Sequence, residues 1–238
     1  MYTYKENRYS SHNQIIDMIR PQSTVLDVGC GQGILSRDLR MKQCQITGID
    51  NVCIDQCVNS YFDSYFRVDL DTLTPLPLED KFDYVIAADV LEHLRTSRQR
   101  LVELRKHMHP GSYLIASTGN IALWVYRLLL LTGRFDYTER GILDETHVHL
   151  FTIANFKRLI ESCEYEIIET SFTPIPFELA IDPKKKRPKL INAITQIYQI
   201  AAKSWPCLFA YQIIVKARLK EQSHAERSVY QWQRYRQN

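Results

Sequence analysis

Apolar positions along the chain recur with two periodicities that belong to different elements. Short apolar runs typical of buried strands occupy residues 24–28, 45–50, 65–68, 82–88, 113–117, 165–170 and 209–217. Between them, Ile34, Leu35 and Leu39 follow helical spacing, and a helix over 101–108 is expected to stop at 109–111. Strands that alternate with helices indicate βαβ units. We therefore predict an α/β fold, a doubly wound and mostly parallel sheet of seven strands.

Two stretches interrupt this alternation. Residues 119–150 are aromatic and apolar, which predicts a helical insertion after the fifth strand. Residues 174–206 predict a second helical insertion, placed before the last strand. We interpret 1–238 as a single domain with a polar and flexible tail at 221–238.

The second insertion contains an amphipathic helix that follows a basic run at 184–187. One face of this helix collects Leu190, Ile191, Ile194, Ile197, Tyr198, Ala201 and Trp205. Such a helix can dock on an anionic membrane surface or a lipid-linked substrate, or it can pack on its own sheet or form a homodimer. The uncharged polar residues Asn192, Thr195, Gln196 and Gln199 favour packing or dimerisation.

Composition narrows the class of protein. The net charge of +3, from 30 basic and 27 acidic residues, is too balanced to indicate a nucleic-acid partner. The six cysteines form no CxxC pair and no cluster with zinc spacing, so we predict no metal site and reduced thiols. The polar N-terminus lacks the apolar core of a signal peptide, and the longest apolar run, 121–131, is shorter than the about 20 residues of a membrane span. A cytoplasmic location is expected.

The segment from Val25 to Gly33 joins the first strand to a glycine-rich turn. In doubly wound folds this turn lies at the carboxyl edge of the sheet, where ligands bind. A dinucleotide fingerprint would place its third glycine at Ile34, and the chain has no P-loop. The turn thus favours a ligand without a pyrophosphate.

Carboxylates at the same edge of the sheet narrow the class of ligand further. Asp50 ends the second strand, where it can accept both hydroxyls of a ribose. Asp69 follows the third strand and can accept an adenine amino group, while Asp27 can face an ammonium group. This acidic edge suits a cationic, phosphate-free ligand.

These residues resemble class I S-adenosylmethionine-dependent methyltransferases. The similarity rests on Asp27–Gly33, Gly48–Asp50, Val68–Leu70, Phe82–Leu94 and His109–Gly111, and covers roughly 9–173. Among the small-molecule members, the chain is similar to the ubiquinone-biosynthesis and methionine-pathway groups. The segments 133–141 and 146–152 resemble members associated with glycan or other secondary pathways.

The resemblance implies a Rossmann-like methyltransferase fold that binds S-adenosylmethionine, with residues 119–150 on the acceptor side. It implies cofactor contacts from Asp27, Gly29, Cys30, Gly31, Gly33, Asp50, Asn51, Asp69, Leu70, Asp89 and Val90. The expected partner is a small-molecule acceptor, with a hydroxyl the favoured group. N- or C-methylation, a NAD-dependent oxidoreductase and a non-catalytic binding protein remain alternatives.

Transfer of a methyl group to a hydroxyl calls for a general base, and histidine suits this role at neutral pH. Three histidines are candidates for the catalytic base: His147, His93 and His149. His93 follows the fourth strand, whereas His147 and His149 share one face if 146–151 is extended.

Overall fold

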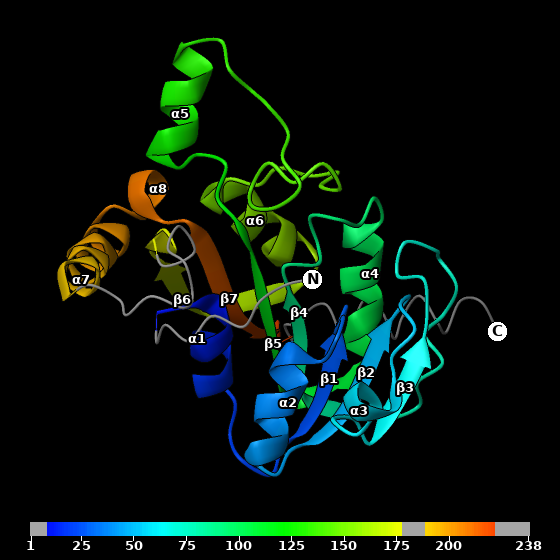
Figure 1. Ribbon diagram of the computed structural model, residues 1–238. Helices are drawn as coiled ribbons and strands as arrows, with labels where there is room; N and C mark the ends of the chain where they lie inside the picture. Colours follow the sequence, from blue (N-terminus) through cyan, green and yellow to red (C-terminus); the bar gives the residue numbers. More distant parts are fainter. Residues whose placement is uncertain (1–8, 178–188, 222–238) are drawn as a thin grey trace.

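The computed structural model describes residues 9–177 and 189–221. A single sheet crosses the molecule in the order β3-β2-β1-β4-β5-β7-β6 (Figure 1). Its strands are β1 (Thr24–Val28), β2 (Gln45–Asp50), β3 (Ser64–Arg67), β4 (Phe82–Ala88), β5 (Met108–Gly119), β6 (Tyr165–Thr173) and β7 (Gln212–Leu219). The first five strands pair in parallel, and β7 lies antiparallel between β5 and β6. The predicted seven-stranded, mostly parallel α/β sheet is confirmed.

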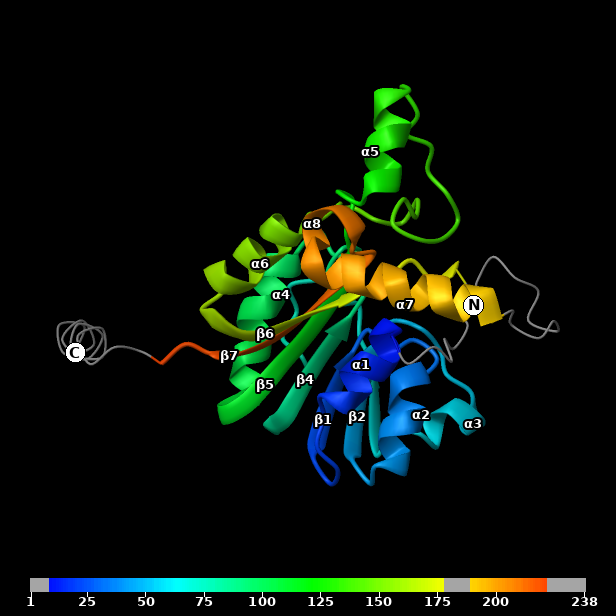
Figure 2. The same cartoon turned by 90° about the vertical axis from the view of Figure 1, so that its left-hand side faces the viewer.

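Helices cover both faces of the sheet, because successive residues of a buried strand point to opposite sides. The helices are α1 (Ser11–Asp17), α2 (Ile34–Met41), α3 (Gln56–Asn59), α4 (Ser97–Leu104), the 3₁₀ turn η1 (Arg105–His107), α5 (Trp124–Leu131), α6 (Ile153–Ser162), α7 (Lys189–Ser204) and α8 (Pro206–Phe209). On β1, Val25 joins the core under α1 and α2, whereas Leu26 joins the core under α4 and α6 (Figure 2).

The strand order reverses at β1, which pairs with β2 on one side and β4 on the other. Chain connections leave in opposite directions at such a switch point, so a crevice opens beyond the carboxyl ends of the two strands. The fold therefore brings together the turn after β1, the end of β2 and the loop after β4.

Two predicted boundaries are wrong. Met108 is the first residue of β5, paired with Phe82, and the helix before it ends at Leu104. The 109–111 segment stays within the strand, where the Ser112 hydroxyl donates to the carbonyl of Phe82. Phe209 belongs to α8 and β7 begins only at Gln212, since Pro206 starts a short helix with its fixed backbone angle.

The amphipathic helix α7 does not bury the face that its sequence predicts. Thr195, Gln199 and Ala202 are buried, and the Gln199 amide donates to the carbonyl of Phe172 on β6. Ile194 and Ile197 are exposed. The alternative in which Ile194 and Ile197 pack on the chain's own sheet is therefore wrong, because tertiary hydrogen bonding to β6 sets the rotation of the helix. Dimerisation, the other predicted alternative, stays a prediction.

The first insertion contains α5 and a loop closed by a bridge between Thr138 and Asp144. Helix α5 stands away from the rest of the chain in both views (Figures 1 and 2). The basic run at 184–187 and the predicted flexible tail, but for its first residue, lie outside the described residues. Across 9–177 and 189–221, no helix combines the length and apolarity needed to cross a bilayer.

Candidate active site

A pocket of about 900 Å³ opens at the predicted crevice. All of the predicted cofactor residues line it, together with one of the three candidate histidines. These residues are Asp27, Gly29, Cys30, Gly31, Gly33, Asp50, Asn51, Asp69, Leu70, Asp89, Val90 and His93. The topology thus gathers residues from four strand ends into one concave site, and His147 and His149 are not among its lining residues.

The glycine turn needs glycine for two separate reasons. Gly29, Gly31 and Gly33 all have positive φ angles of 67°, 51° and 68°, a conformation that side chains disfavour. A Cβ on Gly29 would also lie 2.4 Å from Cγ2 of Val90. The missing side chain lets the turn after β1 touch the loop after β4, while a Cβ on Gly31 would meet no atom within 4 Å.

Asp50 is held in place by backbone donors. Its Oδ2 accepts from the amide of Gly31 at 2.7 Å, and its Oδ1 accepts from the amide of Val52 at 3.2 Å. Each carboxylate oxygen has a further lone pair. The carboxylate is therefore fixed in direction and can still accept two hydroxyl groups.

Asp27 lies deeper, at the end of β1, and is buried. Burial raises its pKa to about 7. The hydrogen bond that the Ser36 hydroxyl donates to Oδ2 at 2.6 Å lowers the pKa, but by less. A carboxyl group whose charge is this poorly solvated favours a cationic neighbour. Asp27 is thus suited to bind an ammonium group.

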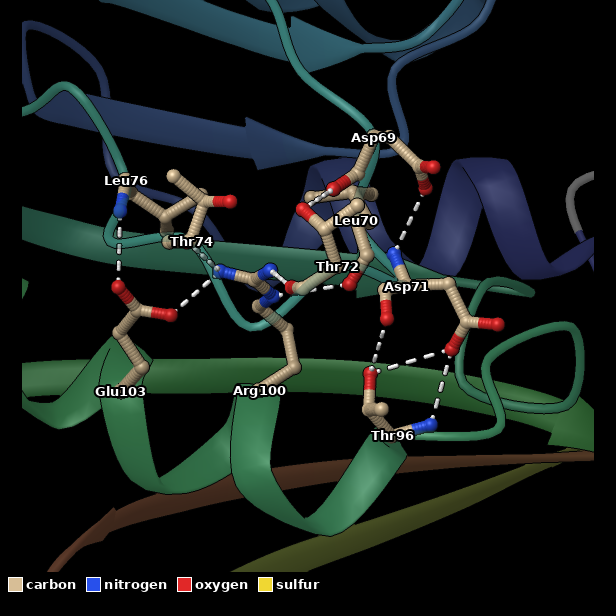
Figure 3. A network of polar contacts seen from close by, with 9 residues as sticks. All are labelled: Asp69, Leu70, Asp71, Thr72, Thr74, Leu76, Thr96, Arg100 and Glu103. Carbon is tan, nitrogen blue, oxygen red and sulfur yellow. Dashed lines mark hydrogen bonds and ion pairs between the residues drawn. The ribbon is translucent and has the colours of Figure 1, made fainter.

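The loop after β3 is clamped by a residue that the sequence did not single out. The buried guanidinium of Arg100 on α4 donates to the carbonyls of Leu70 and Thr72 and pairs with Glu103 (Figure 3). Nearby, Asp71 accepts from the amide of Thr96 at 2.9 Å. These contacts fix the segment that carries Asp69 and Leu70. The sequence offers one signal for this role, a basic residue on the buried face of a helix. That signal can be recognised only after the buried face is known.

Asp89 occupies an unusual backbone position at the end of β4, with a φ of 54°. The Ser117 hydroxyl donates to its Oδ1 at 2.8 Å, and the Gln212 amide donates to its Oδ2 at 2.7 Å. Asp is one of the few residues with a side chain that tolerates the left-handed region. Ser117 and Gln212, both missed by sequence reasoning, therefore set the direction of a carboxylate at the pocket wall.

His93 and His147 meet edge to face, with ring centroids 4.6 Å apart. The Thr146 hydroxyl donates to Asp144 at 2.6 Å, so it can only accept from Nδ1 of His93, 3.1 Å away. Nδ1 also lies 3.3 Å from the Thr146 carbonyl. Neutral His93 therefore carries its proton on Nδ1 and leaves Nε2 as a proton acceptor. Burial, together with the neighbouring His147, holds the pKa of His93 below its usual range.

The other two candidate histidines lie in different surroundings. Nδ1 of His147 lies 3.0 Å from the carbonyl of Ile142, which fixes its ring against His93. His149 does not join this pair, because its ring packs against Phe151 at 5.7 Å. The condition for a shared face, an extended segment over 146–151, is not met, because Thr146 lies in a turn and Val148 in a bend.

Glu92 ties the insertion to the loop after β4. Its carbonyl accepts from the amides of Val148 and His149 at 2.9 and 3.0 Å. Its carboxyl group is buried, and this burial, reinforced by Asp89, raises its pKa to about 8. Within the described residues, no cluster of side chains suits a metal ion, and all six cysteines are free thiols.

Comparison of the sequence with known proteins gives one consistent result. A family model described as a methyltransferase domain matches residues 6–170. A ubiquinone biosynthesis O-methyltransferase of Rickettsia bellii is 28% identical over 167 residues, which are 68% of this chain and 64% of the relative. That of Aeromonas salmonicida is 25% identical over 135 residues, 52% of this chain and 54% of the relative. The chain thus matches less than two thirds of the length of these relatives.

Solved structures share the fold. A SAM dependent methyltransferase from Archaeoglobus fulgidus is 17% identical with a TM-score of 0.56, covering 86% of this chain and 90% of that chain. Magnesium protoporphyrin IX methyltransferase from Synechocystis, with bound SAH, is 19% identical with a TM-score of 0.56, covering 89% and 82%. At these identities the likeness concerns the arrangement of helices and strands.

Proposed function

Because the chain belongs to the methyltransferase-domain family, we propose that it transfers a methyl group from S-adenosylmethionine to a hydroxyl oxygen of a small molecule. The observation that carries this proposal is the pocket at the switch point. It combines a glycine turn with acidic residues from four strand ends and contains no dinucleotide fingerprint. A cationic ligand with a ribose and an adenine satisfies these groups.

Different residues of the pocket would bind different parts of this cofactor. Asp50, held by two backbone amides, would accept the ribose hydroxyls, with Asn51 beside it. The loop of Asp69 and Leu70, clamped by Arg100, would bind the adenine. Asp27 and the glycine turn would receive the methionine end, where the buried carboxylate gains a cationic partner.

When bound, S-adenosylmethionine supplies an electrophilic methyl carbon. The protein then has to position an acceptor, exclude water and remove the acceptor's proton. We assign proton removal to Nε2 of His93, since Nδ1 is committed to Thr146 and the ring lines the pocket. His147 orients this ring from the insertion and disfavours its protonated form.

Two observations favour oxygen as the acceptor atom. A neutral histidine at the pocket wall is the base that a hydroxyl needs and that a free amine needs less. The relatives from Rickettsia bellii and Aeromonas salmonicida are named O-methyltransferases. The insertion at 119–150 would form the acceptor side, which specifies the substrate through a loop of its own.

Calorimetric titration with S-adenosylmethionine, and separately with NADH, tests the cofactor. We expect S-adenosylmethionine to bind and Asp50→Ala to weaken binding at least about tenfold, the cost of a lost charge-assisted hydrogen bond. Glu166→Ala, at the far edge of the sheet where Glu166 pairs with Arg218, is the matched control and should bind normally. Binding of NADH instead would favour an oxidoreductase, and binding of neither a non-catalytic role.

Release of S-adenosylhomocysteine in the presence of hydroxylated small molecules and glycans tests the reaction. We expect His93→Gln to lower kcat about a hundredfold or more while cofactor affinity stays unchanged. His109→Gln, which alters a histidine that contacts Asp83 outside the pocket, should leave kcat unchanged. Turnover of amines but not hydroxyls, or full activity of His93→Gln, would contradict O-methylation with His93 as base.

A further inference from the structure

Large apolar side chains gather on two neighbouring helices at the carboxyl end of the sheet. On α7, Ile197 and Ile200 are 69% and 66% exposed, and Trp205, just after the helix, is 62% exposed. On α5, Leu128 and Leu130 are half exposed and Leu131 is 82% exposed. We call these six residues the docking face. Several large apolar side chains exposed on adjoining helices favour an interaction site.

The two helices form one connected platform. Nε1 of Trp124 on α5 donates to the hydroxyl of Tyr198 on α7 at 2.7 Å. Arg127 on α5 donates to the carbonyl of Cys207 on α8 at 3.0 Å, and Tyr198 and Trp205 both pack against Phe209 of α8. Both helices lie beyond the carboxyl ends of β4 and β5, the end at which the pocket opens (Figures 1 and 2).

The chain around the docking face is basic. No Asp or Glu occurs from 119 to 135 or from 183 to 220. Arg134 and Lys203 are exposed beside α5 and on α7. The sequence adds four basic residues at 184–187, outside the described residues and directly before the segment that leads into α7. Asp136 and Glu139 follow the α5 segment and are accompanied by Arg140.

The charge and the shape of the docking face together indicate which kind of partner binds there. A second copy would bring two basic, acid-free faces together, which disfavours association. Helix α5 projects from the body as a convex element, whereas an apolar interface between copies needs a complementary surface (Figure 2). Apolar side chains flanked by basic ones fit the surface of an anionic bilayer, into which the former insert while the latter contact phosphate groups.

We propose that the chain docks through α5 and α7 onto the surface of an anionic phospholipid bilayer, with its pocket opening toward that surface. This inference goes beyond the proposed methyl transfer, because it concerns where the protein binds rather than what it catalyses. Docking of this kind is peripheral and depends on apolar insertion and on charge together.

Flotation of the full chain with vesicles tests the proposal. Vesicles that contain phosphatidylglycerol should bind the chain, vesicles of phosphatidylcholine alone should not, and high salt should weaken binding. Leu131→Glu and Ile197→Glu should each lower the partition coefficient about tenfold or more. Arg134→Gln and Lys203→Gln should each lower it about fivefold. Met41→Glu is the matched control, since Met41 is 84% exposed at the end of α2, away from the docking face.

Several outcomes would overturn the proposal. They are absence of binding, equal binding to neutral vesicles, or an equal loss with Met41→Glu. Light scattering without vesicles must show the same mass for the wild type and Ile197→Glu, because a dimer that the variant dissociates would make the face an interface between copies. Calorimetry with S-adenosylmethionine on each variant keeps this test separate from the proposed function, and unchanged melting temperatures exclude misfolding.

Discussion

At the scale of single residues, the backbone conformation shapes the pocket as much as side-chain chemistry does. Gly29 combines a left-handed backbone with a contact that leaves no space for a Cβ, because Val90 fills that position. Gly133 is also left-handed, at a φ of 74°, but a Cβ there would meet nothing within 4 Å. Alanine substitutions at these two glycines therefore distinguish the cost of backbone strain from the cost of a steric clash.

Gly29→Ala should abolish measurable binding of S-adenosylmethionine, because the turn must move away from Val90. Gly133→Ala should lower the free energy of unfolding by about 1 kcal/mol through its backbone alone and leave binding intact. Calorimetry and thermal melting of both variants measure the difference. Normal cofactor affinity in Gly29→Ala would show that the contact with Val90 is unimportant.

The protonation of His93 predicts a pH dependence of the reaction. Only the neutral ring can accept a proton, and its pKa is lowered by burial and by His147. Activity should therefore be full at neutral pH and fall as the pH drops below the ordinary histidine value of about 6.5. In His147→Ala the like charge is gone, so the acidic limb of the kcat profile should move to higher pH. An unchanged profile would exclude the coupling between the two rings.

At the scale of elements, the clamp between α4 and the loop after β3 positions one side of the pocket. A single guanidinium donates to the carbonyls of Leu70 and Thr72 while remaining buried (Figure 3). A lysine has the same charge but lacks this planar set of donors. The loop is thus held by geometry as much as by charge.

Arg100→Lys should raise the Kd for S-adenosylmethionine about tenfold and reduce thermal stability, since it leaves buried carbonyls without donors. Arg98→Lys on the same helix, where Arg98 contacts the Ser162 hydroxyl at the surface, should change neither quantity. Calorimetry and melting curves measure both. Equal behaviour of the two variants would show that α4 does not position the loop of Asp69 and Leu70.

At the scale of the whole molecule, two buried carboxyl groups link stability to pH. Burial raises the pKa of Glu92 to about 8 and that of Asp27 to about 7. A carboxyl group with a raised pKa stays protonated in the folded chain after it has ionised in the unfolded chain. Its contribution to stability is therefore fully present below the unfolded pKa and is lost as the pH rises through the folded value.

Chemical denaturation from pH 5 to pH 9 tests this linkage through Glu92→Gln, which keeps the shape of the side chain and removes the titration. The variant should gain stability relative to the wild type as the pH rises toward about 8 and level off above it. Glu166→Gln, which alters an exposed carboxylate paired with Arg218, should show no such gain. A constant difference between wild type and Glu92→Gln across this range would mean that Glu92 ionises normally.

The sheet, the glycine turn and the acidic edge of the pocket could all be predicted from the sequence. These features are encoded locally, because strand periodicity, a left-handed turn and a carboxylate at a strand end each involve a few consecutive residues. All of the predicted cofactor residues consequently line one pocket, since parallel strands bring their carboxyl ends to the same edge.

The residues that surround this edge of the pocket, and the surfaces that stay exposed, depend on how distant elements pack together. Strand periodicity would align His147 with His149, but the chain bends at Val148, so His147 meets His93 and His149 packs against Phe151. Arg100 became recognisable once α4 packed over the loop after β3. Helix α7 buries Gln199 and exposes Ile197, because a hydrogen bond to β6 overrides its own apolar pattern. Contacts between residues distant in sequence carry no local signal, so the fold alone specifies them.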